Sequence, residues 1–371
     1  MEKENFTQKL NDIFNHLHQN AEISHEETET TQFIYNQLKQ YDCRITTFEN
    51  QTGLYADIGQ GSPVVAVRAD IDALWQEING QFQANHSCGH DAHMTIVLGT
   101  FMQLVDQQDQ LNGTVRFIFQ PAEEKGTGAL QMVEQSAVDG VDYLYGMHLR
   151  PIQELTNGRY APAIRHGASR FVSGVITGED AHGARPHLNS NAIQIGAELV
   201  QLINNIHLDP MIPHSMKVTS FHSGGKSTNI IPGKAEFSID MRAQSNELMD
   251  EMQQQLESTV SSLAKLRNVG IDLSIGANLP AALINDDAHD HMEKAIADVV
   301  GEEHLHPMIT TTGGDDFHFY SIKRPELKAT MLAIGCDLKP GLHHPYMTFN
   351  HDVIPEASDI LTRAILNTLG E

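Results

Sequence analysis

The sequence predicts an α/β protein with a mostly parallel sheet, interrupted by an inserted α+β domain. Short apolar runs alternate with helical stretches up to His148 and again from Asp287 onward, a pattern typical of parallel strands covered by helices. Between these parts the order is strand, helix, two strands and helix, which fits a ferredoxin-like unit. The length of 371 residues also exceeds what one core usually holds, so we expect two domains.

The elements of the first α/β part follow from apolar periodicity and from turn residues. The Asn112-Gly113 turn starts one strand, and Pro121 follows its end. The expected helices cover residues 5–20, 28–40, 94–105 and 128–136, and the expected strands cover residues 64–67, 114–119 and 141–147. This alternation places helices on the faces of one sheet.

The middle of the chain changes to an α+β pattern. Its expected strands cover residues 169–176, 217–221 and 235–241, and its expected helices cover residues 191–205 and 246–266. The α/β pattern resumes with a helix over 287–300, a strand over 329–334 and a helix over 355–369. We therefore expect a discontinuous domain of residues 1–167 and 277–371, with an inserted domain of residues 168–276.

The charge balance excludes two classes of partner. Lys and Arg total 24 against 48 Asp and Glu, a formal net charge of −24, which repels phosphate backbones and anionic lipids. We therefore expect neither a nucleic-acid nor a membrane partner. No apolar run approaches the ~18 residues of a membrane span, and Met1 to Asn5 begin no apolar signal segment. Three cysteines, few and odd in number, fit a cytoplasmic location.

The stretch Cys88-Gly89-His90-Asp91-Ala92-His93 carries one thiol and two imidazoles directly before a helical run. Thiolate and neutral imidazole are ligands for zinc, and mixed sites with carboxylates also take manganese, cobalt or nickel. Cys88 and one histidine can supply two ligands of a metal site. We expect His93 to pack or hydrogen-bond beside the site, and Asp91 to orient a neighbour or cap the helix.

Further polar residues follow the strands of the predicted sheet. Glu123 and Glu124 follow one strand, His148 follows the next, and His343 lies eight residues after the last. Because ligands of open α/β sheets bind outside the carboxyl ends of the strands, these residues can converge. One of the two glutamates could hold a metal while the other takes a proton from a water. The alternative is a solvated acidic pair at the start of a helix.

Several motifs together resemble peptidase family M20, subfamily D. These motifs, which run in order over nearly the whole chain, are Arg68-Ala69-Asp70-Ile71-Asp72-Ala73-Leu74, His86 to His93, Phe119-Gln120-Pro121-Ala122-Glu123-Glu124, His182-Gly183-Ala184-Arg185-Pro186-His187, Asn229-Ile230-Ile231-Pro232, Gly314-Asp315-Asp316-Phe317 and His343-His344-Pro345. The subfamily holds aminoacylases, hippurate hydrolases and auxin-conjugate hydrolases. Within it, the chain is most similar to bacterial AmhX-type amidohydrolases.

The resemblance implies a two-metal hydrolase of N-acyl amino acids or related small amides, with a lid domain that also forms a homodimer. Carried over by position, the implied metal ligands are Cys88, His90, Glu124, His148 and His343, and the implied general base is Glu123. In relatives, residues that match His182 and Asn229 polarise the scissile carbonyl, and one that matches Arg242 grips the substrate carboxylate. The implied cofactors are two divalent ions per subunit, zinc or manganese first, then cobalt or nickel.

One segment departs from the family pattern, and three other functions stay open. Trp75-Gln76-Glu77 replaces the usual proline after Ala73-Leu74, and the connection to Cys88 is short. Trp75, the only tryptophan, could pack in the core or line the substrate site. A dipeptidase on the same scaffold, a non-catalytic metal-binding protein and a hydrolase with Cys88 as nucleophile remain alternatives. Gly224-Gly225-Lys226-Ser227-Thr228 is no P-loop, because Ser220 stands where a glycine is required.

Overall fold

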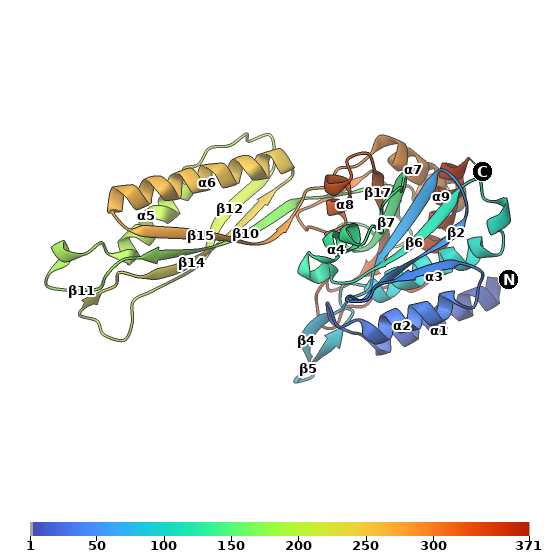
Figure 1. Cartoon of the computed structure of the whole chain (residues 1–371), viewed down its shortest axis with the longest axis horizontal. Coiled ribbons are helices and arrows are strands. Elements are labelled where there is room, and N and C mark those ends of the chain that lie inside the picture. The colour runs from blue at the N-terminus through green and yellow to red at the C-terminus, as the bar shows by residue number, and fades with distance from the viewer. Residues whose placement is uncertain (1–2, 371) are drawn as a thin grey trace. The chain divides into compact units, whose positions relative to one another are not determined.

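The computed structural model describes residues 3–370 and divides the chain into two compact units (Figure 1). Unit 1 comprises Met1–Arg165, Leu283–Thr310 and Asp315–Glu371, and unit 2 comprises His166–Ala282 and Thr311–Gly314. Met1 and Glu2, the start of the stretch in which we expect no signal segment, lie outside the described residues. None of the helices between residues 3 and 370 combines the length and apolarity needed to cross a membrane.

Unit 1 is built on a seven-stranded sheet. In spatial order its strands are β1 (Arg44–Thr47), β2 (Leu54–Gly59), β6 (Thr114–Gln120), β3 (Val64–Asp70), β7 (Tyr143–Pro151), β17 (Lys328–Leu338) and β8 (Tyr160–Ala161). The four strands from β6 to β17 are parallel, whereas β2 pairs antiparallel with β6, and β8 with β17. The prediction of a mostly parallel sheet is confirmed, with antiparallel strands added at both sides.

Strand β7 extends beyond its predicted end. The sequence pattern ends this strand at Met147 and places His148 after it, but β17 continues to pair with β7 as far as Leu338 and Pro151. His148 therefore lies inside the strand, opposite Ala333. Its side chain direction is fixed by the pleat rather than by a loop.

Helices cover the sheet of unit 1. They are α1 (Lys3–Gln19), α2 (Thr28–Leu38), α3 (His90–Val105), α4 (Gly128–Glu134), α7 (Asp286–Val300), α8 (His318–Lys323) and α9 (Val353–Leu369), with short 3₁₀ turns η1 (Gln108–Gln110), η2 (Glu123–Lys125) and η4 (Glu302–His304). Helix α3 contacts α1, α9 and β3, and nearly every one of its side chains is buried. Such burial fixes the first turn of α3 in place.

Unit 2 is a four-stranded antiparallel sheet with two helices. In chain order its main elements are β10 (Ala168–Thr177), α5 (Ala192–Asn204), β12 (His214–Ser223), β14 (Ala235–Ala243), α6 (Asn246–Arg267) and β15 (Gly270–Leu279), and the strand order is β12-β14-β10-β15. Strand β15, which the sequence pattern misses, completes the ferredoxin-like βαββαβ order. Its side chains are mostly exposed, although Ile271 and Leu273 pack against the core of unit 2.

The remaining elements are short pairs. They are the hairpin β4 (Leu74–Ile78) and β5 (Gln81–Asn85), the pair β9 (Ile164–His166) and β16 (Ile309–Thr311), and the pair β11 (Ala181–His182) and β13 (Ile230–Ile231), which flanks the 3₁₀ turn η3 (Pro186–Leu188). The hairpin β4–β5 occupies the segment that departs from the family pattern. Trp75 in β4 is 60% exposed, so the interpretation that this residue packs in the core is wrong.

Candidate metal centre

The first turn of α3 presents Cys88 and His90 from a tightly fixed bend. Gly89, the residue before the helix, has a left-handed backbone with φ 86°, which glycine adopts without strain. A Cβ atom at this position would lie 2.8 Å from Cδ1 of Leu149 in β7. The Gly89 carbonyl also accepts hydrogen bonds from the amides of Ala92 and His93. A glycine is therefore required for the bend that aims the two side chains.

The ring of His90 is oriented by the backbone of Asp72. Nδ1 of His90 lies 2.9 Å from the Asp72 carbonyl oxygen, which can only accept, so Nδ1 carries the proton. In the neutral imidazole, Nε2 is then the unprotonated acceptor, and it is fully buried and without a hydrogen-bond partner among the described residues. It lies 3.9 Å from Oε1 of Glu124 and 4.0 Å from Oε2 of Glu123. Such a buried, unsatisfied nitrogen is a position that a cation would fill.

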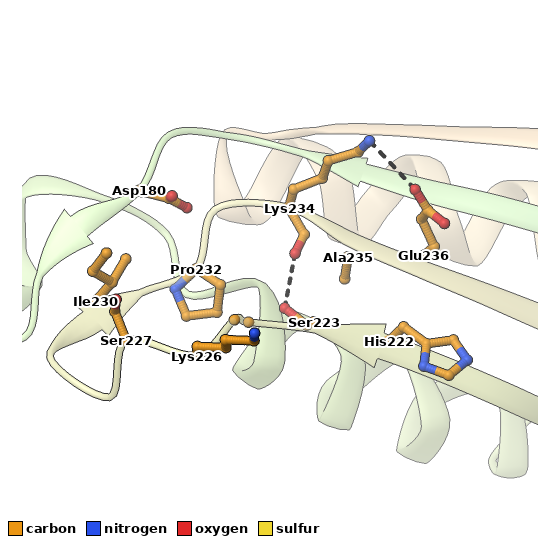
Figure 2. Close-up of a pocket in the computed structure, with 12 residues that line it drawn as sticks. Asp180, His222, Ser223, Lys226, Ser227, Ile230, Pro232, Lys234, Ala235 and Glu236 are labelled. Atoms are coloured by element: carbon orange, nitrogen blue, oxygen red, sulfur yellow. Dashed lines mark hydrogen bonds and ion pairs between the residues drawn. The ribbon is translucent and has the colours of Figure 1, made fainter.

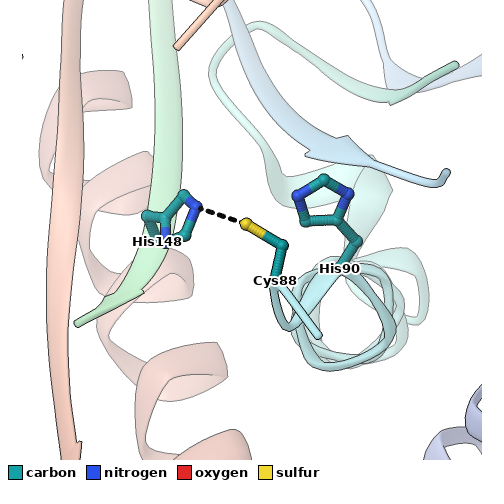
Figure 3. Close-up of side chains that lie close together, drawn as sticks. All are labelled: Cys88, His90 and His148. Carbon is teal, nitrogen blue, oxygen red and sulfur yellow. Dashed lines mark hydrogen bonds between the residues drawn. The ribbon is translucent and has the colours of Figure 1, made fainter. Parts of the chain in front are cut away.

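His148 has the same arrangement on the other side of the thiol. Its Nδ1 donates to the carbonyl of Leu149 over 2.7 Å, and its Nε2 lies 3.6 Å from Sγ of Cys88. Figure 3 shows the Cys88 side chain between the two imidazoles, which come from β7 and α3. Two ring nitrogens and one sulfur therefore face a common point in a buried space.

Glu123 and Glu124 form the turn η2 directly after β6, and Asp72 holds this turn. The backbone amides of Glu123 and Glu124 donate to the two carboxylate oxygens of Asp72 over 3.1 and 3.0 Å, and Ser24 donates to Asp72 over 2.6 Å. Oε1 of Glu124 is buried and has no hydrogen-bond partner among the described residues, while Oε2 lies 3.4 Å from Nε2 of His343. Asp72 thus braces both glutamates.

The donor atoms fit a pair of cations. Sγ of Cys88 belongs to one group with His90 and His148 and to another with Glu124 and His343, and within each group the atoms lie within 4.8 Å of one another. One shared thiolate can therefore serve two neighbouring positions. The mixture of thiolate, imidazole and carboxylate suits zinc, manganese, cobalt or nickel.

Burial without a cation disfavours charge on two groups of this cluster. Burial raises the pKa of the Cys88 thiol, and the nearby Glu124 carboxylate raises it further. Burial and the carboxylates of Asp315 and Glu124 also raise the pKa of Glu123. A divalent cation would reverse this effect for Cys88, because a coordinated thiol loses its proton. The positive charge of a nearby cation would likewise favour the ionised form of Glu123.

His93 and Asp91 have partners outside the donor groups that contain Cys88. His93 donates from Nδ1 to Asp70 over 2.7 Å, and its Nε2 accepts from the amide of Leu149 over 3.1 Å. Both ring nitrogens are thus engaged, so His93 packs beside the site as expected. Asp91 accepts a hydrogen bond from His18 over 2.7 Å.

A buried network behind Glu123 has no counterpart in the predicted site. Arg68 bonds to Asp70 over 2.7 Å and to Asp316 over 2.8 Å, and Gln120 bonds to both Arg68 and Asp316. The amide of Asp316 lies 3.4 Å from Oε1 of Glu123. Asp315, the neighbour of Asp316, accepts a hydrogen bond from the amide of Phe317 over 2.9 Å.

The remaining site residues of the sequence-based prediction lie in unit 2. His182 in β11 and Asn229 before β13 are neighbours, since the amide of Gly183 donates to the Asn229 carbonyl over 2.7 Å. Arg242 lies near the far end of β14, opposite Ser169, roughly 23 Å along the strand from Ala235, the first residue of β14. Unit 2 taken by itself therefore does not bring Arg242 together with His182 and Asn229. Arg242 bonds to Asp240 over 2.8 Å.

A pocket of about 460 Å³ lies beside Ile230 of β13. Figure 2 shows Lys226 on the loop after β12, and Lys234 paired with Glu236 over 3.3 Å. The glycine pair 224–225 lies on this loop, and β13 rather than a helix follows it. The structure thus agrees with the exclusion of a P-loop.

Comparisons with known proteins agree with this geometry. The family model described as peptidase family M20/M25/M40 matches residues 66–367. An N-acetyl-L-cysteine deacetylase of Bacillus subtilis is 32% identical over 94% of this chain and 85% of its own length, and the IAA-amino acid hydrolase ILR1-like 6 of Arabidopsis thaliana is 31% identical over 91% and 75%. A crystal structure of a Bacillus subtilis protein described as a dinuclear metal binding peptidase from the M20 family superimposes with a TM-score of 0.84 at 25% identity, and covers 99% of both chains.

Proposed function

Because the chain belongs to peptidase family M20/M25/M40, we propose that it is a metal-dependent amidohydrolase that cleaves N-acyl amino acids or related small amide conjugates. The observation that carries this proposal is that two groups of donor atoms share Sγ of Cys88, one with His90 and His148 and the other with Glu124 and His343. A further carboxyl group, Glu123, lies within 4.0 Å of His90 and outside the two donor groups that share the thiol. Such an arrangement supplies both a place for cations and a base for water.

The five converging side chains would hold two divalent ions, zinc or manganese in the first place and cobalt or nickel otherwise. When bound, the ions would acidify a water molecule and polarise the amide carbonyl. The donor groups share Cys88, and Asp72 braces Glu124 through its amide. The ligands are therefore held by the fold before any ion arrives.

Glu123 is the general base in this proposal. It takes a proton from the attacking water and passes it to the nitrogen of the leaving amine. Burial and neighbouring carboxylates raise its pKa, and a carboxyl group of raised pKa can both accept and return a proton near neutral pH. Asp72 and Asp316 hold the Glu123 backbone and carboxyl group in place.

The residues of unit 2 are assigned to the substrate. His182 and Asn229 would donate hydrogen bonds to the carbonyl oxygen as negative charge develops there. Arg242 would bind a free carboxylate of the substrate. In some relatives the residues that match His182 and Asn229 act across a homodimer. We assign the same kind of dimerisation to unit 2 of this protein. We also assign the protein to the cytoplasm.

The relatives suggest the substrate class. Their names specify an N-acetylated amino acid and IAA-amino acid conjugates, which share an acyl group on the nitrogen of an amino acid with a free carboxylate. A dipeptidase activity is the second candidate, because the similar crystal structure is described as that of a peptidase. A pure metal-binding role would use Glu123 only as a further ligand beside His90 and Glu124.

The test is a substrate panel with metal-depleted and metal-restored enzyme. N-acetyl, N-benzoyl and longer N-acyl amino acids and dipeptides are incubated with each form. We expect hydrolysis of N-acyl amino acids that a chelator abolishes and zinc or manganese restores. Activity that survives metal removal would support Cys88 as a nucleophile, and preferential cleavage of dipeptides would support the peptidase. Absence of activity in every form would contradict both.

A further inference from the structure

The loop that carries His343 needs support from outside itself. The His343 side chain is 55% exposed, so burial does not fix it. Its backbone has a left-handed conformation with φ 63°, which a residue with a Cβ atom adopts only when its surroundings hold it there. One hydrogen bond, from its amide to the Ser87 carbonyl over 2.8 Å, attaches the loop next to Cys88.

The hairpin β4–β5 supplies the second attachment. Gln76 donates from Nε2 to the His343 carbonyl over 2.7 Å. Asn85, on the facing strand, donates from Nδ2 to Oε1 of Gln76 over 2.9 Å and to the carbonyl of Pro345 over 3.1 Å. The two amides thus bind the loop at residues on both sides of His344.

The orientations of the side-chain amides of Gln76 and Asn85 are determined by their hydrogen-bond partners. The carbonyls of His343 and Pro345 can only accept, so both Gln76 and Asn85 must turn their NH₂ groups toward the loop. The oxygen of Gln76 then faces the NH₂ group of Asn85, which is the observed contact. Reversing either amide would break at least one of these hydrogen bonds, so Asn85 keeps the donor of Gln76 aimed at His343.

A third contact ties the tip of the hairpin to the end of the same loop. The amide of Asn79 donates to the Tyr346 hydroxyl over 3.2 Å, and that hydroxyl donates to Oδ1 of Asn79 over 3.0 Å. Tyr346 is 53% exposed. The loop is therefore held by polar contacts along its length, in addition to Leu342 and Met347, which pack against the core at its two ends.

The two faces of the hairpin have different surroundings. Gln76, opposite Gln83, and Asn85, opposite Leu74, share one face, while Trp75 and Phe82 lie on the other. Trp75 and Phe82 are 60% and 61% exposed. The face that holds the loop is thus distinct from the face that carries the aromatic side chains.

We propose that Gln76, oriented by Asn85, is a positioning residue that holds the backbone of His343 and thereby aims its imidazole at Glu124. This inference rests on the proposed function, in which His343 is a metal ligand. Without the hydrogen bond the loop samples other backbone conformations, and the group formed by Cys88, Glu124 and His343 loses its third donor for part of the time. Loss of partners that orient a ligand typically lowers metal affinity by about 10–100-fold.

The test compares Gln76→Met with Gln83→Met. Methionine keeps the length and the neutral charge of glutamine but donates no hydrogen bond. Gln83 lies opposite Gln76 on the same face and, among the described residues, makes no hydrogen bond to the loop, so its variant controls for the loss of an amide on this hairpin. Zinc and manganese affinities are measured by chelator competition without substrate, and hydrogen exchange is measured for the amides of His343, His344, Tyr346 and Met347.

We expect Gln76→Met to weaken one metal equivalent on the order of 10-fold and to accelerate exchange in the loop, while Gln83→Met changes neither. Asn85→Asp, a second variant, replaces the donor that orients Gln76 and should weaken the same equivalent. Wild-type affinity for both ions in Gln76→Met and Asn85→Asp would overturn the inference.

His343→Ala separates this inference from the proposed function. If His343→Ala loses one metal equivalent while Gln76→Met retains it, the metal site stands and the inference alone is wrong. If His343→Ala retains both equivalents at wild-type affinity, the ligand assignment is wrong and the inference falls with it. Absence of amide hydrolysis by the wild-type enzyme would contradict the proposed function and leave the metal measurements unaffected.

Discussion

Arg68 donates a hydrogen bond to Asp316 over 2.8 Å, although the two residues are 248 positions apart and both side chains are fully buried. Asp70 accepts from the same guanidinium and Asp315 lies 3.6 Å away. The pKa of Arg68 is raised despite its burial, because these carboxylates surround it. The ion pair therefore joins the strand β3 to the segment before α8 directly behind the proposed base.

Replacing Arg68 by Met should destabilise the protein strongly. The variant leaves Asp70 and Asp316 as buried carboxylates without their cation, and breaking a buried pair in this way typically costs about 3–5 kcal/mol. The free energy of unfolding in urea, followed by circular dichroism, measures the loss. Arg324→Met is the control, because its partner Asp139 is half exposed and the cost there should stay below about 1 kcal/mol. Equal losses in both variants would contradict the role of the buried network.

Replacing Glu123 by Gln should abolish turnover while the metal content stays near that of the wild type. Glutamine has the same shape but cannot take a proton from water, and general bases contribute typically 10²–10⁴-fold to the rate. Glutamine would also relieve the crowding of charge with Asp315 and Glu124 that raises the pKa of Glu123. Turnover is measured on the best substrate of the panel, and metal content by elemental analysis.

Retained activity in Glu123→Gln would reject the base assignment. Loss of both activity and metal would instead make Glu123 a ligand, which its position within 4.0 Å of Nε2 of His90 allows. Glu124→Gln provides the comparison, because a ligand variant should lower metal content as well as rate.

Local patterns predicted the parts of the molecule that have local causes. Apolar runs such as 114–119 marked the central strands. The cluster of Cys88 and His90 marked the candidate site, but the expected start of the helix at residue 94 was wrong, because α3 begins at His90. Strand β15 was missed although Ile271, Leu273 and Ile275 alternate with polar or small residues. This alternation is the signal that could have marked the strand, even though most of its side chains are exposed.

The supporting contacts of the site could not be predicted from local pattern. Arg68 and Asp316 meet only after the chain has passed through unit 2, and the hydrogen bond from Gln76 to His343 spans 267 positions. Asp72 carried a weak signal, since a carboxylate after a buried strand needs a partner. The partners of Asp72, the amides of Glu123 and Glu124, are brought to it by the fold and could not be identified from the local sequence.

The ion pair between His18 and Asp91 predicts a pH-dependent stability. Nδ1 of His18 lies 2.7 Å from the buried Asp91 carboxylate, and this hydrogen bond raises the pKa of His18. A raised pKa in the folded state stabilises the protein fully below the unfolded value of about 6.5. The contribution is lost as the pH rises through the folded value. His18→Gln should therefore cost more stability at about pH 6 than at about pH 9.

The measurement is the difference in unfolding free energy between wild type and His18→Gln at the two pH values. His16→Gln is the matched control on the same helix, because His16 stacks on Phe33 and has no carboxylate partner among the described residues. A cost of His18→Gln that rises with pH would contradict the sign of the prediction. A loss of unfolding free energy in His18→Gln that equals the loss in His16→Gln at both pH values would show that the ion pair contributes nothing.

Unit 2 offers a test of packing that is independent of the metal centre. Gly174 in β10 lies opposite Phe237 in β14, and a Cβ atom at Gly174 would fall 2.0 Å from Cζ of that buried ring. Gly174→Ala must displace the ring from its place in the core, and such overpacking typically costs about 1–3 kcal/mol. Gly276→Ala in β15 is the control, since its nearest neighbour would be an ordinary contact at 3.5 Å.

Hydrogen exchange of the β10 and β14 amides in the full chain reports the loss of stability locally. The double variant Gly174→Ala with Phe237→Leu should exchange more slowly than Gly174→Ala alone. Slower exchange in Gly174→Ala than in the wild type would show that the glycine weakens the strand rather than making room for the ring.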